Sequence, residues 1–397
     1  MLLASYKMNF SGDHYKFNRI FLSVIGLWPH RHITLRQIQG IISSVVLISV
    51  TSPQLIKLFT IEYDVTLVLR ILSSVLPFLL FIVKYVTFYF ITENISELMQ
   101  QIKTDWNILK DNNELEIIHR YTKVARLYTM SIATLIYMCL FIIICIQYVP
   151  CILDVVMPLN NSRRVALLFQ VEYLVNHEEY YHVIQLHLHI GLLVAATTVL
   201  ATESFCLTLS IHAFAMFKIA SYRMQRIIDK NSLNLLIEKH CALYKNVVAA
   251  VDGHRRAIEF SECIKRTFTI PYLALILLGV TSTSVNLFLL FQVITSMTSM
   301  DDLMRSIVFV VCHLIYMFLT NYAGQKFIDH AVDVYQKICN VRWYNAPLRI
   351  QKHLLFIMQK AIKSYCMDVG GLYNPSLQGF TTLASASLSY FTVLCSI

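Results

Sequence analysis

A histidine-rich stretch is the first place to look for chemistry, because His177, Glu178 and His182 resemble the ligands and the base of a zinc site. The HExxH motif binds zinc through two histidines one helical turn apart on the same face. Here the two histidines lie five residues apart, so they do not share a helix face. We therefore expect no metal site and interpret the stretch as an exposed outer loop.

Other catalytic patterns are missing from the sequence. There is no GxSxG, Walker or GxGxxG phosphate loop, and none of the 10 cysteines forms a CxxC pair. No pair of carboxylates lies where acid–base work is expected. The sequence therefore predicts neither an enzyme nor a cofactor.

Charged residues are rare well inside long apolar segments, where they are usually functional. Lys84 and Glu203 lie at matching depths in their segments. They could form an ion pair, or each could extend separately to the membrane surface. We do not interpret either as part of a transport relay.

The last apolar segment is uncharged but rich in hydroxyl groups. Thr382, Ser385, Ser389, Val393 and Ile397 follow one helix face at steps of three and four. Small hydroxyl residues allow close helix packing in lipid, but they also line water-filled paths that a hydrophobic constriction closes. The pattern alone leaves both readings open, and a pore would require several copies of this helix around an axis.

The elements that must position these residues are membrane-spanning helices. Hydrophobic residues make up 56% of the 397 residues and charged residues only 14%, whereas soluble domains carry about 25% charge. A spanning helix needs about 20 apolar residues. The segments that qualify are 38–61, 66–92, 127–155, 184–217, 268–296, 305–325 and 377–397.

The basic residues fix the predicted orientation. Connections 1–37, 93–126, 218–266 and 326–363 hold five, five, ten and seven of the 33 lysines and arginines, and the alternate connections hold almost none. Because basic connections stay in the cytoplasm, we expect a cytoplasmic N-terminus and an extracellular C-terminus. This orientation is opposite to that of the G-protein-coupled receptors, and the basic net charge does not indicate nucleic acid.

The sequence thus predicts an all-α integral membrane protein of seven transmembrane helices that extend into a cytoplasmic anchor region. Residues 1–37 form a cytoplasmic N-terminus with an amphipathic interfacial helix, and residues 38–325 form a six-helix bundle with cytoplasmic helical extensions. Residues 326–375 form anchor helices, and residues 376–397 form the last span.

Five stretches of the chain carry a family resemblance: Ser389–Leu394, Gly370–Pro375, Trp343–Leu348, Asn321–Gln325 and His254–Phe260. In these stretches the sequence resembles the insect odorant receptors, most closely those of ants, bees and wasps. The resemblance implies a subunit of an odorant-gated, non-selective cation channel that forms a heterotetramer with the co-receptor Orco. It also implies the plasma membrane of olfactory neuron dendrites as the location. The chain lacks the long insertion of Orco itself, so it resembles a tuning subunit.

The resemblance also implies where the sites lie. By position, the hydrophobic gate falls on Val393 and Ile397, the same residues that helical spacing selects. The odorant pocket falls in the outer half of the bundle, where we expect a hydrophobic volatile or cuticular compound to bind by shape and dispersion. Mapped by depth, the pocket draws on Leu72, Val75, Leu76, Leu79, Ile144, Tyr148, Cys151, His187, Gly191, Val194, Phe309, His313 and Tyr316.

Two other classes stay open at this point. The gustatory receptors share the topology and pore position, and a transporter would show internal repeats or paired midplane charges, which the sequence lacks. Asn160 begins the one N-x-S/T sequon on the predicted outer side and is a candidate for glycosylation.

Overall fold

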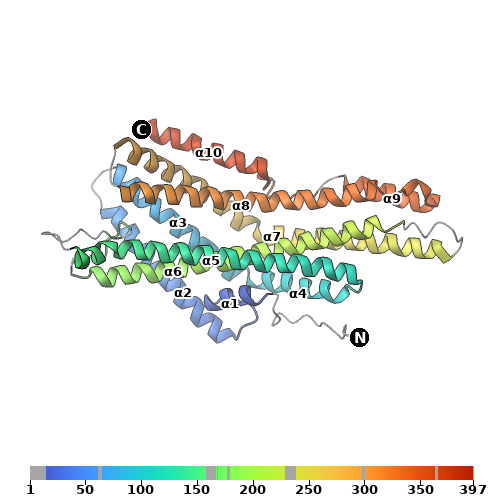
Figure 1. Cartoon of the computed structure of the whole chain (residues 1–397), viewed down its shortest axis with the longest axis horizontal. Coiled ribbons are helices and arrows are strands. Elements are labelled where there is room, and N and C mark those ends of the chain that lie inside the picture. The colour runs from blue at the N-terminus through green and yellow to red at the C-terminus, as the bar shows by residue number, and fades with distance from the viewer. Residues whose placement is uncertain are drawn as a thin grey trace.

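In the computed structural model the chain is an elongated bundle of helices (Figure 1). The structure describes residues 15–60, 65–157, 167, 169–176, 179–228, 238–296, 300–362 and 365–396. The helices are α1 (Lys16–Val24), α2 (Ile33–Thr60), α3 (Val65–Phe90), α4 (Thr92–Ile108), α5 (Asn112–Val156), α6 (Tyr181–Gln225), α7 (Glu238–Ser296), α8 (Met300–Cys339), α9 (Leu348–Ala361) and α10 (Leu377–Ser396), with a short 3-10 turn, η2 (Trp343–Asn345), before α9.

Each of the seven predicted spans corresponds to one long helix: α2, α3, α5, α6, α7, α8 and α10. Six of these helices are long and apolar enough to cross a membrane by length and composition. The exception is α10, because its serines and threonines lower its hydropathy. Pro53, Pro77 and Pro271 lie inside α2, α3 and α7, which membrane helices tolerate because neighbouring groups satisfy the freed carbonyls.

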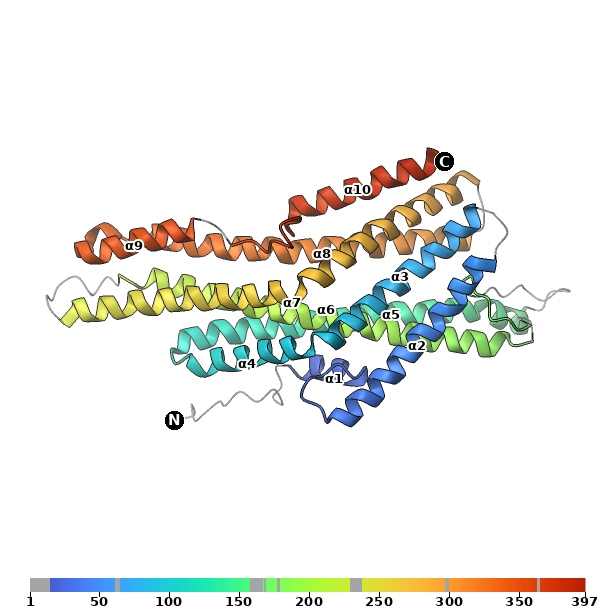
Figure 2. The same cartoon turned by 180° about the vertical axis from the view of Figure 1, so that it is seen from behind.

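Figures 1 and 2 show two halves of the bundle along its long axis. The half that contains α2, α3 and α10 is called the membrane half below. The other half, called the distal half, contains α4, α9 and the continuations of α5, α6, α7 and α8. The sequence predicted these continuations from amphipathic patterns below the spans, and α5 and α6 indeed run unbroken for 45 residues each.

The N-terminal helix α1 packs against α6 and α5. Asn18 on its inner face donates a hydrogen bond to Thr208 Oγ1 at 2.7 Å, and Leu22 is fully buried. Ile20 and Val24 on its outer face stay exposed. The predicted amphipathic helix is therefore present, and its polar Asn18 is fastened inside the bundle.

A tight turn leads into α10. Gly370 and Gly371 have φ values of +64° and +71°, a conformation that glycine adopts without the steric cost of a side chain. The Asp368 carboxylate accepts a hydrogen bond from the Gly371 amide at 3.0 Å. This turn reverses the chain so that α10 lies beside α7 and α8 in the membrane half.

Candidate pore helix and ligand-binding region

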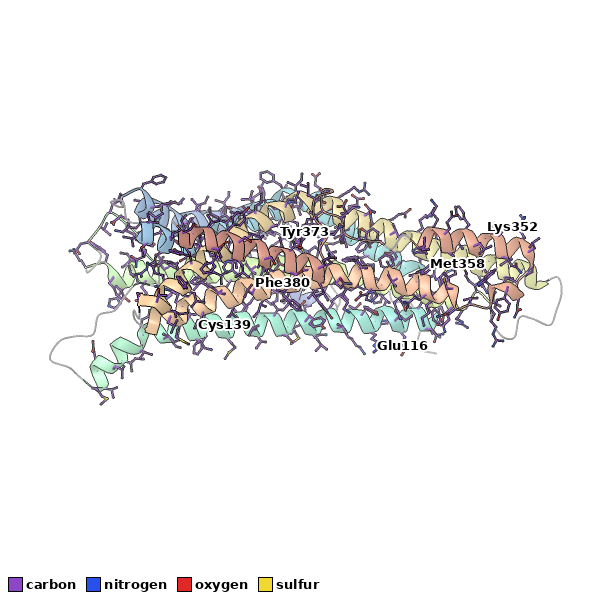
Figure 3. The ribbon with its side chains drawn as sticks, turned by 90° about the horizontal axis from the view of Figure 1, so that it is seen from above. Glu116, Cys139, Lys352, Met358, Tyr373 and Phe380 are labelled. Carbon is purple, nitrogen blue, oxygen red and sulfur yellow. The ribbon has the colours of Figure 1, made fainter. Side chains whose placement is uncertain are left out.

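One face of α10 is packed against its own chain. Leu383 lies in a cluster with Val280 of α7 and Met317 of α8, and the Phe380 ring contacts Phe318 edge-on at 5.5 Å. Figure 3 shows Phe380 on this helix beside α8. Leu394 packs near the far end of α10 against a leucine cluster of α3 and α7.

The opposite face of α10 is not covered by any described part of the chain. Thr382, Ser385, Ser389 and Val393 are all exposed, and Val393 has a relative accessibility of 55%. The hydroxyls of Thr382 and Ser389 donate back to carbonyls one turn earlier, at 3.1 and 3.0 Å. Their donors are thus satisfied without water. Ile397, the second residue of the expected gate, lies outside the described residues.

The start of α10 is attached to α8 by polar and close contacts. Asn321, fully buried on α8, accepts hydrogen bonds from the Tyr373 hydroxyl and, at 3.3 Å, from the Ser376 amide. A Cβ atom added to Gly324 would lie 2.3 Å from the Pro375 carbonyl oxygen. Only a glycine at this position lets α8 approach the segment before α10 so closely.

The structure brings Lys84 and Glu203, the charged residues singled out in the sequence, together. Lys84 of α3 forms an ion pair with Glu203 of α6, and it also donates to the Tyr316 hydroxyl of α8 at 2.9 Å. The Lys84 side chain is 6% exposed. This buried network joins three helices, and Tyr316, which depth alone assigned to the odorant pocket, is part of it.

Nine of the other predicted pocket residues fall into three groups. Leu72, Leu76 and Leu79 pack toward α7 and α10. His187 and His313 have structural partners: His187 contacts Ser49 at 2.9 Å and Tyr173 at 2.7 Å, and His313 contacts Ser282 at 2.8 Å. The third group has no hydrogen-bond partner of this kind. Val75 is buried, Val194 packs against the main core, Ile144 is half-buried, and Tyr148 is 37% exposed and contacts the His189 ring at 5.9 Å.

Gly191 has a close-packing role. A Cβ atom added there would lie 2.2 Å from Val50 of α2. The side chain of Cys151 lies outside the described residues. The predicted pocket residues therefore include several whose present contacts hold helices together.

A small cavity of about 30 Å³ lies where the loop before α6 meets α3, α7 and α8. Phe309 is the one predicted pocket residue that lines it. The other face of α3 contributes Arg70, Ser73 and Ser74 rather than the leucines. The aromatic ring of Phe169 from the loop closes one side and contacts Phe78 edge-on at 5.3 Å.

Comparison with protein families decides among the classes that the sequence left open. The family model described as 7tm Odorant receptor matches residues 64–388 of this chain. The chain belongs to the odorant receptor family. This family consists of receptors and not of enzymes.

Two solved odorant receptor structures share the fold. The insect olfactory receptor OR5 from Machilis hrabei in complex with eugenol aligns with a TM-score of 0.77 at 14% identity, covering 96% of this chain and 97% of that one. Without the eugenol, OR5 aligns with a TM-score of 0.72 at 13% identity and 96% coverage of both chains. At these identities the likeness establishes the seven-helix architecture of the receptor.

A curated relative is the putative odorant receptor 85d of Drosophila melanogaster. It is 25% identical over 146 residues, which cover 37% of this chain and 34% of that protein. The match thus spans about a third of the relative's length.

Three residues of the remaining candidate sites lie outside the described part of the chain: His177 and Glu178 of the zinc-like stretch, and Asn160. Among the residues that are described, no group of three or more histidines, cysteines or carboxylates is placed to hold a metal ion.

Proposed function

We propose that this odorant receptor is a tuning subunit of an odorant-gated, non-selective cation channel that assembles with Orco as a heterotetramer. The observation that carries the proposal is the one-sided packing of α10. Its apolar face is covered by α7 and α8, whereas its hydroxyl-bearing face, ending in Val393, is bare in the single chain. A helix of this kind suits the wall of a shared central path.

The chemistry of the bare face supports a pore of low selectivity. Thr382, Ser385 and Ser389 offer hydroxyl oxygens, and α10 has no charged residue. Strong discrimination between cations needs a ring of carbonyls or carboxylates, so we expect sodium and potassium to pass alike. Val393, with Ile397 beyond it, would close the path by excluding water from an apolar ring.

A single helix cannot enclose a path, so the proposal requires other subunits around the axis. The amphipathic α9 and the ends of α7 and α8 lie at the far end of the molecule from α10 (Figure 3). Leu348, Phe356 and Ile362 remain exposed there. We propose that this region is the cytoplasmic anchor between subunits, which requires the N-terminus inside and the C-terminus outside.

The ligand is proposed to be a hydrophobic volatile or cuticular compound that binds in the outer part of the membrane half. Movement there can reach the pore helix through α8. Tyr316 joins the buried Lys84–Glu203 network, and Asn321, slightly more than one turn further along α8, holds the start of α10. A small shift of α8 would therefore displace the base of the pore helix.

The proposal is tested by recording from cells that express this chain alone, Orco alone, or both, with a panel of volatile and cuticular compounds. We expect a ligand-dependent current, carried by sodium and potassium, only in cells that express both this chain and Orco. An epitope tag after Ile397, stained on intact cells, measures surface expression and tests the outward C-terminus. An equally large ligand-evoked current without Orco would contradict the heteromeric assembly. Ligand binding that evokes no current in cells expressing both proteins would contradict the channel.

A further inference from the structure

The cavity between α3, α7 and α8 differs chemically from the apolar pocket that the family resemblance implies. Arg70 and Arg305 both line it, together with the amides of Gln170 and Asn286. None of the described residues that line it is acidic. The site thus offers hydrogen-bond donors and positive charge, and its described wall supplies no counter-charge.

Arg70 is the decisive residue. It lies about one and a half turns after the start of α3 at Val65 and is half-buried. Within the part of the chain that the structure describes, its guanidinium has no hydrogen-bond or ion-pair partner. Arg305 has an interaction of its own within the chain, so Arg70 is the cation that remains for a ligand. A partly buried cation gains most from an anion that can share its low-dielectric surroundings.

The size and lining of the cavity indicate the shape of that anion. A volume of about 30 Å³ exceeds the ~10–15 Å³ that one water molecule needs, and it fits a small planar group rather than a whole odorant. The planar guanidinium fork of arginine matches a carboxylate through two parallel hydrogen bonds. Phe169 and Phe309 form an apolar border beside the donors.

We propose that this cavity is an anion niche that binds the carboxylate head of an amphiphilic ligand, with its hydrocarbon chain lying against Phe169 and Phe309. This inference rests on the proposed ligand-binding function and names a chemical class for it. A hydrocarbon chain cannot fit in the cavity as it stands, so Phe169 and its loop must move aside. That loop is attached by the Lys57–Glu172 ion pair at 3.0 Å and by the Tyr173–His187 contact.

The test compares ligands that differ only in the head group. Straight-chain acids from hexanoate to tetradecanoate, their methyl esters and their alcohols are applied to cells that express the receptor with Orco. Carboxylic acids have a pKa near 4.3 in water and are ionised at neutral pH, whereas the esters stay neutral. We expect at least one acid to act at a lower concentration than its ester and alcohol.

Substitutions at Arg70 separate the niche from general loss of function. Arg70→Gln is expected to raise the half-maximal concentration of the active acid by at least about tenfold and to leave the esters nearly unchanged. Arg70→Lys, which keeps the charge but loses the fork, should fall between the two. Arg36→Gln removes a charge near the start of α2, from a residue that does not line the cavity, and serves as the control. An equal shift for acids and esters would overturn the niche.

A binding measurement distinguishes failure of the niche from failure of the proposed channel. The receptor purified with Orco in phosphatidylcholine nanodiscs is titrated with radiolabelled acids of the same series. Saturable binding that Arg70→Gln weakens supports the niche even if no current is seen, in which case the channel proposal fails alone. Absence of saturable binding across the series overturns the niche. Binding lost only when phosphatidylglycerol is added would identify a lipid head group, rather than a diffusible acid, as the source of the anion.

Discussion

The two halves of the bundle are held together by different chemistry. In the distal half, charged side chains join the helices: Arg223 of α6 donates two hydrogen bonds to Glu114 of α5 at 2.6 and 2.8 Å, and Lys218 of α6 pairs with Asp333 of α8 at 3.0 Å. The hydrogen bond to Glu114 is the main cause of the raised pKa of Arg223. In the membrane half, helices meet mainly through small or apolar residues, as where Gly191 faces Val50.

This difference indicates which half can move. Bidentate ion pairs are directional and hold two helices in one register. Apolar contacts in lipid have no preferred direction, and small residues allow helices to slide against each other. We infer that the distal half acts as a fixed anchor, and that ligand binding and pore opening rearrange the membrane half. The Lys84–Glu203–Tyr316 network differs from these contacts, because it places a charged, directional lock among the mobile helices.

The largest expected effect comes from breaking that lock. Lys84→Met removes the buried cation from Glu203 and from the Tyr316 hydroxyl. Breaking a buried pair typically costs about 3–5 kcal/mol, and because the Glu203 side chain is 27% exposed, we expect the lower end of that range. We expect little folded receptor at the cell surface and a clearly lower thermal midpoint in detergent. The double variant Lys84→Met with Glu203→Gln removes both charges and should recover much of the loss.

Lys57→Met is the matched control for this prediction. In its ion pair with Glu172 the lysine itself is accessible to water, with 29% of the side chain exposed against 6% for Lys84, so about 0–1 kcal/mol is expected. If Lys57→Met were as harmful as Lys84→Met, or if the double variant were no better than the single one, the network would not be a lock.

A smaller effect is expected where α8 supports α10. Gly324→Ala places a methyl group against the Pro375 carbonyl, and such overpacking costs about 1–3 kcal/mol. Because the segment before α10 must shift, we expect a changed ligand-evoked current at matched surface expression. Gly279→Ala on α7 is the control, since a Cβ there meets no atom within 4 Å. Similar currents from the two variants would mean that the base of α10 does not influence gating.

The sequence predicted the fold well, because the length of an apolar run is an intrinsic property that tertiary contacts do not change. The seven spans were visible in this way, and amphipathic patterns beyond them indicated their helical continuations. Equal depth also indicated that Lys84 and Glu203 could meet. The involvement of Tyr316 could not be foreseen, because depth along a helix does not reveal which neighbour a side chain faces.

The ligand region was harder to predict for the same reason. On α3 both faces are apolar enough for lipid or protein, so hydropathy alone did not distinguish the face of Leu72 and Leu76 from that of Arg70 and Ser74. The signal that could have identified the cavity was Arg70 itself, a charge inside a predicted span. On α10, by contrast, hydroxyl residues follow one face, and the structure leaves that face bare.

The subtlest prediction concerns the two neighbouring residues at the outer end of α10. Val393 is exposed, whereas Leu394, about 100° around the helix, packs against the cluster that contains Leu76 and Leu289. Val393→Ser should ease wetting of the proposed constriction and raise the basal current in cells that also express Orco. Leu394→Ser should instead lower the thermal stability or surface expression, because it removes a packed side chain.

The two variants differ by one position and introduce the same side chain, so each is the control for the other. In the proposed heterotetramer, other subunits would contribute most of the constriction, so the rise with Val393→Ser should be partial and must be compared at matched surface expression. Whole-cell current without ligand, normalised to tag staining, is the measurement. If Leu394→Ser raised the basal current as much as Val393→Ser, the bare face of α10 would not line the path, because the covered face would then be equally sensitive to a polar side chain.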